Sequence, residues 1–207
     1  MIGHKASLED RKYAYWISEA ESKRPKKNIL LIHGFGGTYS GLEDLSDLLS
    51  KENNVIGVDL PGYGLSEPMN RQHTLQNYAD FLDLFCHSTD FHRVTVVGHS
   101  FGADIALVFA SMYPGRVDDL VLISPVISPD KGLGLLGKHY YRIIEKLPTK
   151  ARHTLLHNHL ITLISDYTMF RKANHEQRTK ILRDDYISDH LMSDRPILES
   201  YRSLVET

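Results

Sequence analysis

Ser100 lies at the centre of a short segment whose residue types could support nucleophilic chemistry. The segment reads Gly98-His99-Ser100-Phe101-Gly102, with one glycine two positions before the serine and another two positions after it. A serine on a sharp turn between a strand and a helix can attack an acyl carbon, and strand and helix then come too close for side chains at the flanking positions. Backbone N–H groups at the start of the helix would stabilise the negative charge that develops. We therefore predict a nucleophile elbow with Ser100 as the nucleophile.

The residues on either side of this segment supply the strand and the helix that such a turn requires. Residues 94–97 form a β-branched run typical of a strand that is buried on both faces. Apolar residues then return at helical spacing over 105–109. Because the side chain of a sequence neighbour projects away from the serine on such a turn, we interpret His99 as a packed structural histidine and not as the base.

The composition of the chain is that of an ordinary globular protein. Of its 207 residues, 42% are hydrophobic and 24% are charged, and the formal net charge is −2. This balance predicts neither a nucleic-acid partner nor an anionic membrane partner. No run approaches the roughly 20 apolar residues of a membrane span, and the N-terminus lacks the apolar core of a signal peptide. With Cys86 as the single cysteine, we expect a cytoplasmic protein without an internal disulfide.

Strands and helices are expected to alternate over the first 125 residues. Apolar runs predict the strands, at residues 11–19, 28–32, 55–58, 94–97 and 120–124. Amphipathic spacing predicts the helices, at residues 41–51, at residues 74–86 and from the elbow to about residue 112. This order predicts an α/β fold with a mostly parallel sheet, in which active-site loops follow the carboxyl ends of the strands.

The pattern changes after Pro125, where helical periodicity continues without a convincing strand. A helical lid over a sheet shapes a substrate pocket and excludes water from it. We therefore predict an α/β core over residues 1–127 and a helical cap over residues 128–207.

Together, the glycine-rich segments resemble those of the α/β-hydrolase superfamily, and within it the capped serine esterases and C–C bond hydrolases. The run His33-Gly34-Phe35-Gly36 is similar to the oxyanion loop of the family, which follows a buried strand. Residues 59–66, Asp-Leu-Pro-Gly-Tyr-Gly-Leu-Ser, match its structural D-x-P-G-x-G-x-S turn. The resemblance covers about residues 12–125, whereas the cap fits only in length and helicity.

The resemblance implies a serine hydrolase that forms an acyl-enzyme on Ser100. It also implies that the backbone N–H groups of Phe35 and Phe101 bind the oxyanion and that no cofactor is needed. The expected partner is a small-molecule substrate, a small or medium carboxylic ester with an apolar acyl part. A serine at the nucleophile position argues against the dehalogenase and epoxide hydrolase branches, which place an aspartate there. The oxyanion loop lacks the Gly-Pro-Gly sequence of many C–C hydrolases, and its absence favours an esterase.

The sequence departs from the family pattern at its C-terminal end. Family members supply the triad acid and histidine from strands that follow the cap, but no strand-like run follows the last expected cap helix, and no histidine follows His190. We expect a chain truncated after the cap, with the triad acid and histidine beyond residue 207. By itself such a chain would hydrolyse esters poorly and leave residues 120–124 as an uncharged, exposed sheet edge. The alternative is a non-catalytic protein that binds a small ligand, or an inactive enzyme fragment. The sequence does not indicate the oligomeric state.

Three histidines in the expected cap, His153, His157 and His159, have the spacing of a partial metal site. His153 and His157 are four residues apart, which places them on one helical face. The segment has no glutamate of the H-E-x-x-H kind and no recognisable third ligand. A packed or solvated helix is therefore favoured over a zinc site, and no metal is predicted.

Two further possibilities have weak support. Residues 132–137 spell G-x-G-x-x-G, but no strand leads directly into them and no acidic residue follows at the distance of a dinucleotide site. We interpret them as a hinge into the cap. Asp130, His139 and His190 are conceivable replacements for the missing triad members, but nothing in their spacing supports these roles.

Overall fold

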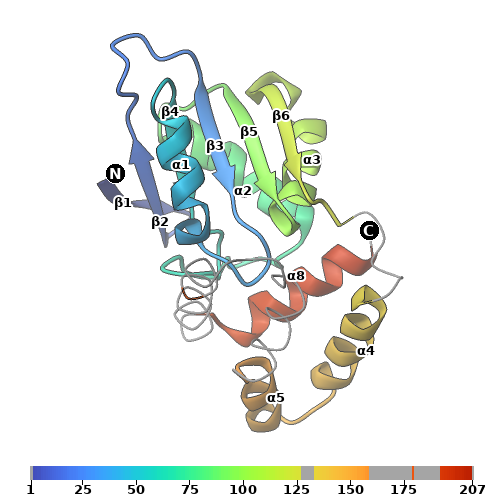
Figure 1. Ribbon diagram of the computed structural model, residues 1–207. Coiled ribbons are helices and arrows are strands. Elements are labelled where there is room, and N and C mark those ends of the chain that lie inside the picture. The colour runs from blue at the N-terminus through green and yellow to red at the C-terminus, as the bar shows by residue number, and fades with distance from the viewer. Residues whose placement is uncertain (1, 127–132, 159–178, 180–191, 207) are drawn as a thin grey trace.

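A mixed sheet forms the centre of the computed structural model, which describes residues 2–126, 133–158, 179 and 192–206 (Figure 1). Its six strands have the order β1-β2-β4-β3-β5-β6. The strands are β1 (Ile2–Leu8), β2 (Arg11–Ser18), β3 (Asn28–Ile32), β4 (Asn54–Val58), β5 (Val94–His99) and β6 (Val117–Ile123). β4, β3, β5 and β6 run parallel, whereas β1 and β2 pair antiparallel. The predicted α/β fold with a mostly parallel sheet is confirmed.

Helices cover both faces of this sheet. They are α1 (Glu43–Leu49) on one face and α2 (Leu75–Ser88) and α3 (Phe101–Met112) on the other (Figure 1). Successive residues of a strand point to opposite faces, so each central strand carries buried apolar residues on both faces. In β3, Ile29 and Leu31 pack on the α1 side, while Leu30 and Ile32 pack with α2 and α3.

The described part of the chain after β6 contains the helices α4 (Leu133–Glu145), α5 (Thr149–Leu156) and α8 (Asp194–Glu206). α8 lies across the end of the sheet at which the parallel strands finish, and α4 and α5 lie farther from the sheet (Figure 1). Among the described residues, no helix is both long enough and apolar enough to cross a lipid bilayer.

β1 is not expected from the sequence, because the turn that joins it to β2 has an unusual composition. Glu9 and Asp10 both have positive φ, 49° and 60°. A two-residue hairpin turn requires such angles, and Asn-Gly or Asp-Gly is the sequence that usually indicates it. Glu9 and Asp10 therefore do not indicate a hairpin. The sequence of residues 2–8 does not indicate a strand either.

The sheet edge at β6 also differs from the expectation. The strand begins at Val117 and therefore includes Asp118 and Asp119. Asp118 is ion-paired with Arg93 and Asp119 with Lys27. The strand thus begins earlier than residue 120, its expected start, and the added residues carry charges that oppose pairing with another strand there.

The expected hinge over residues 132–137 is wrong from Leu133 onward, because α4 begins at that residue. Gly137 has a packing role inside the helix. A Cβ atom at this position would lie 2.6 Å from the hydroxyl oxygen of Tyr201, so the glycine allows α4 to approach α8 closely.

Candidate active site

Ser100 occupies a strained turn between β5 and α3. Its backbone angles are φ 51° and ψ −121°, which residues with a side chain rarely adopt. The Ser100 N–H donates to the carbonyl oxygen of Ile123 in β6 over 2.8 Å, and the Ala103 N–H donates to the Ser100 carbonyl oxygen over 2.8 Å. These bonds hold the serine in the geometry of a nucleophile elbow.

The two glycines that flank the turn permit the close approach of α3 to β5 and to the end of β3. A Cβ atom on Gly98 would overlap the backbone carbonyl group of Gly102. A Cβ atom on Gly102 would overlap the carbonyl oxygens of Ile32 and His33. Because backbone atoms cannot move aside as a flexible side chain can, both positions require glycine.

The glycine-rich loop after β3 lies against the elbow. β3 and β5 are neighbours in the sheet, with Ile32 opposite Gly98, so the loops that follow the two strands meet. A Cβ atom on Gly34 would lie only 3.3 Å from Cβ of Ser100. The sheet order thus brings together two segments that are far apart in the sequence.

This loop contains a defined tight turn. Gly36 has φ 72°, and the Gly37 N–H donates to the Gly34 carbonyl oxygen over 3.1 Å. Both features are those of a type II turn with Phe35 at its second position. The N–H of Phe35 therefore belongs to a fixed turn beside Ser100, while its role as an oxyanion donor together with the N–H of Phe101 stays a prediction.

His33 links the loop after β3 to the loop after β4. Its Nε2 atom accepts the N–H of Leu60 over 2.9 Å, so the ring proton lies on Nδ1, which donates to the Gly34 carbonyl oxygen over 2.8 Å. Burial lowers the pKa of His33 to about 4. With both ring nitrogens occupied, this neutral histidine positions the loop and is not available as a base for Ser100.

Asp59 organises the turn over residues 59–66. Its Oδ1 accepts the N–H of Tyr39 over 2.8 Å and its Oδ2 accepts the N–H of Leu65 over 2.9 Å. Gly64 has φ 53° and packs directly on this carboxylate, where a Cβ atom would overlap it. Burial raises the pKa of Asp59 to about 6. The carboxylate is fully engaged in the turn, in accordance with the structural role that the sequence predicts.

No histidine among the described residues is hydrogen-bonded to the Ser100 hydroxyl. His99 is half-buried and packs against Gly34, and burial lowers its pKa. His139 lies exposed on α4. Three residues considered from the sequence lie outside the described residues: Asp130, His159 and His190. The described part of the chain therefore contains Ser100 and its surroundings, with no histidine hydrogen-bonded to the serine hydroxyl.

Aromatic side chains fill the space between the elbow and the C-terminal helices. Phe35 contacts four rings at centroid distances of 5.9–6.2 Å, those of Tyr63, Phe101, Tyr141 and Tyr201. Tyr141 of α4 stacks on Tyr201 of α8 at 3.9 Å. The sequence analysis did not anticipate these tyrosine contacts, because no local motif places α4 and α8 above Phe35.

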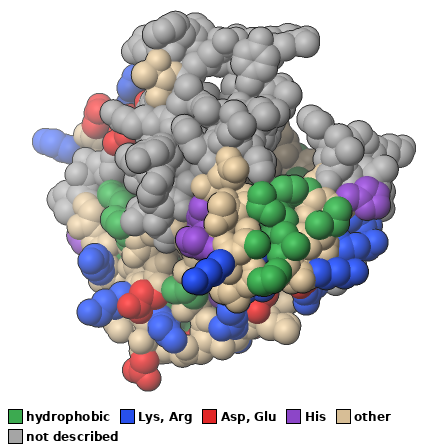
Figure 2. All heavy atoms as spheres, turned by 90° about the horizontal axis from the view of Figure 1, so that it is seen from below, with side chains coloured by type: hydrophobic (Ala, Val, Ile, Leu, Met, Phe, Trp, Pro, Cys, Tyr) green, Lys and Arg blue, Asp and Glu red, His purple; other side chains and the backbone are tan. Residues whose placement is uncertain are grey.

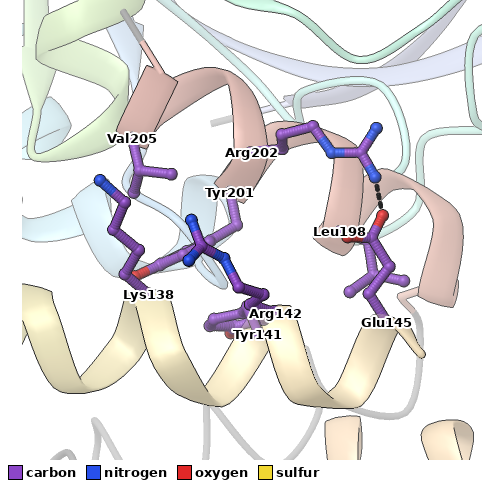
Figure 3. A pocket seen from close by; sticks show the side chains of 8 residues that line it. All are labelled: Lys138, Tyr141, Arg142, Glu145, Leu198, Tyr201, Arg202 and Val205. Carbon is purple, nitrogen blue, oxygen red and sulfur yellow. Dashed lines mark ion pairs between the residues drawn. The ribbon is translucent and has the colours of Figure 1, made fainter. Parts of the chain in front are cut away.

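A pocket of 290 Å³ opens between α4 and α8 beside this aromatic cluster (Figure 3). Its walls are formed by Lys138, Tyr141, Arg142 and Glu145 of α4 and by Leu198, Tyr201, Arg202 and Val205 of α8. Glu145 is ion-paired with Arg202 across the pocket (Figure 3). The pocket therefore combines an apolar wall with basic side chains.

α8 is held over the site by hydrogen bonds to the start of α2. Glu199 Oε2 accepts both the Nδ1–H of His73 over 2.8 Å and the backbone N–H of His73 over 2.9 Å. Tyr78 and Ser200 share a buried hydrogen bond of 2.9 Å. Burial lowers the pKa of His73, so the ring is neutral, and its Nε2 accepts the N–H of Met69 over 3.1 Å. The position of Tyr201 over Phe35 follows from this docking.

Known proteins share both the sequence pattern and the fold. Residues 27–198 match the family model of the alpha/beta hydrolase fold. The chain is 34% identical over 129 residues to the dihydrolipoyllysine-residue acetyltransferase component of the acetoin cleaving system of Cupriavidus necator, which covers 58% of this chain and 34% of that protein. It is 24% identical over 157 residues to a "Probable serine hydrolase" of Drosophila melanogaster, covering 69% of this chain and 46% of that protein.

The chain thus spans less than half of the length of either curated relative. Among solved structures, a hydrolase from Pseudomonas aeruginosa PA01 has a TM-score of 0.74 at 15% identity, with 99% of this chain and 73% of that chain covered. At this identity the likeness concerns the fold alone. Since the family model spans most of the chain, the chain belongs to the alpha/beta hydrolase fold family.

Proposed function

We propose that the protein is a serine hydrolase that cleaves a carboxylic ester with an apolar acyl part through an acyl-enzyme on Ser100. The observation that carries the proposal is the strained backbone of Ser100 between two glycines that no other residue can replace. Strain is retained in a fold where function requires it, and this turn places the half-buried Ser100 at the end of a central strand.

The surroundings of Ser100 support acyl transfer. The hydroxyl oxygen would attack the ester carbon, and the N–H groups of Phe35 and Phe101 would stabilise the oxyanion of the tetrahedral intermediate. The alkoxide or alcohol of the ester then leaves, and water releases the acyl group in a second step. The proposal assigns the base and the acid of the triad to residues outside those described.

The aromatic cluster supports an apolar substrate. Phe35, Tyr63, Tyr141 and Tyr201 present rings beneath α4 and α8, where an acyl chain would lose its contact with water. We propose that α4, α5 and α8 act as the cap that covers this space. The relative named "Probable serine hydrolase" is consistent with this chemistry.

Labelling by a fluorophosphonate tests the proposal on the natural gene product. We expect covalent labelling of the wild-type protein, none of Ser100→Ala and unchanged labelling of Ser111→Ala, an exposed serine near the end of the same helix. Loss of a triad serine lowers kcat by about 10⁶-fold in a well-studied protease. If the wild-type protein is not labelled and hydrolyses no p-nitrophenyl ester, yet still binds an apolar ligand, it is a non-catalytic binding protein.

A further inference from the structure

Two of the histidines of the 153–159 segment meet an aspartate from the other end of the C-terminal region. Nδ1 of His153 lies 2.8 Å from Oδ1 of Asp194, and Nε2 of His157 lies 3.1 Å from the same oxygen. The three ligand atoms lie within 4.8 Å of one another. This cluster joins α5 to the first residue of α8, and in Figure 1 α5 is the helix farthest from the sheet.

The local structure explains why the three side chains converge. His153 and His157 are one helical turn apart, and the His157 N–H donates to the His153 carbonyl oxygen over 3.1 Å, so both rings project from the same face of α5. Their ring centroids are 4.4 Å apart. Asp194 stands at the start of α8, whose docking on α2 brings it to this face. The sequence offered no third ligand because Asp194 is separated from the histidines by 37 and 41 residues.

We propose that His153, His157 and Asp194 form a binding site for one divalent transition-metal ion, with Zn²⁺ as its reference ligand. Two imidazole nitrogens and one carboxylate oxygen are a recurrent ligand set for zinc. Ligand atoms that share a tetrahedral ion at about 2.1 Å stand about 3.4 Å apart. The two N–O separations, 2.8 Å and 3.1 Å, must widen by about 0.3–0.6 Å to admit the ion, and all three ligand atoms already lie within 4.8 Å of one another.

The surroundings favour a partly enclosed site that is open on one side. The side chains of His157 and Asp194 are 13% and 16% exposed, whereas that of His153 is 63% exposed. On the face seen in Figure 2, histidine side chains reach the surface beside basic and hydrophobic side chains. Arg152 Nε lies 3.5 Å from Oδ2, the second oxygen of Asp194. Its positive charge opposes a cation electrostatically, and its Nε makes no hydrogen bond to the carboxylate.

Metal binding would replace the protons through which the two imidazoles contact Asp194. Nδ1 of His153 and Nε2 of His157 carry a proton when they donate to Oδ1, so each ring would bind the ion in its other neutral tautomer. A bound ion would connect α5 to α8 directly, which predicts a higher melting temperature in the presence of zinc.

Calorimetric titration with Zn²⁺ of the chelator-treated natural gene product, freed of any affinity tag, tests this site. We expect one ion per chain with micromolar or tighter affinity, and a dissociation constant at least about tenfold weaker in His153→Ala, whose side chain is exposed and whose loss leaves the packing intact. His139→Ala, which removes an exposed histidine from α4, is the matched control and keeps the wild-type constant.

Two further measurements sharpen the test. Asp194→Asn keeps the size of the side chain and should weaken zinc by at least about tenfold. Co²⁺ bound to the wild-type protein should show the visible absorption of a tetrahedral ion, which His153→Ala should lack. Absence of micromolar zinc binding, or equal affinities of the wild-type protein and His153→Ala, would overturn the proposal. None of these readouts depends on Ser100, so they test the metal site independently of the proposed hydrolase activity.

Discussion

The N–H of Leu60 donates to Nε2 of His33 over 2.9 Å and joins the loops that follow β4 and β3. Through its other nitrogen the same ring holds the Gly34 carbonyl oxygen. The loop beside Ser100 therefore depends on an uncharged histidine inside the core.

This relationship predicts a pH dependence of stability. Burial lowers the pKa of His33 from 6.5 to about 4. Between pH 4 and pH 6.5 this histidine is therefore protonated in the unfolded chain and neutral in the folded chain. The contribution of His33 to the free energy of unfolding is full above pH 6.5 and is lost as the pH falls toward 4. The variant His33→Gln retains an acceptor for the N–H of Leu60 but does not titrate. As the pH falls from 6.5 to 4, the free energy of unfolding of the wild-type protein should therefore decrease by about 3 kcal/mol relative to that of His33→Gln. Urea unfolding at a series of pH values measures it, and a difference that is constant with pH contradicts the assignment.

Gly102 should tolerate no side chain. The added methyl group of Gly102→Ala overlaps the carbonyl oxygens of Ile32 and His33, and we expect a loss of at least about 1–3 kcal/mol in the free energy of unfolding. Gly115→Ala is the control, because its Cβ atom meets nothing within 4 Å, and it should be near neutral. Equal stabilities of the two variants would show that α3 does not approach the end of β3 as described.

The role of the Phe35 N–H in catalysis can be separated from that of its ring. Proline is favoured at the second position of a type II turn, so Phe35→Pro removes the N–H while it retains the turn. We expect kcat for an ester to fall about 10²–10³-fold, as for loss of one oxyanion donor. Phe35→Leu keeps the N–H and should mainly raise KM. If both variants lose kcat equally, the ring matters and the N–H does not.

Local patterns in the sequence predicted five of the six strands and the strand, turn and helix around Ser100. The runs of β3 and β4 are apolar because both faces are covered, and Cys86 lies in the core on the predicted face of α2. The contacts that the sequence did not reveal join distant segments. His73 and Glu199 are 126 residues apart, and no periodicity connects them. The position of α8, the tyrosines above Phe35 and the third ligand of the histidine cluster all follow from this long-range packing.

The claim that Ser100 is the nucleophile is tested most directly by trapping the acyl-enzyme. The natural gene product is mixed briefly with a p-nitrophenyl ester and quenched in acid, and its peptides are then examined by mass spectrometry. The account predicts an acyl group on the peptide that contains Ser100, its position fixed to that residue by fragmentation, and no adduct in Ser100→Ala. An acyl group on another residue, or ester turnover that persists undiminished in Ser100→Ala, would contradict it.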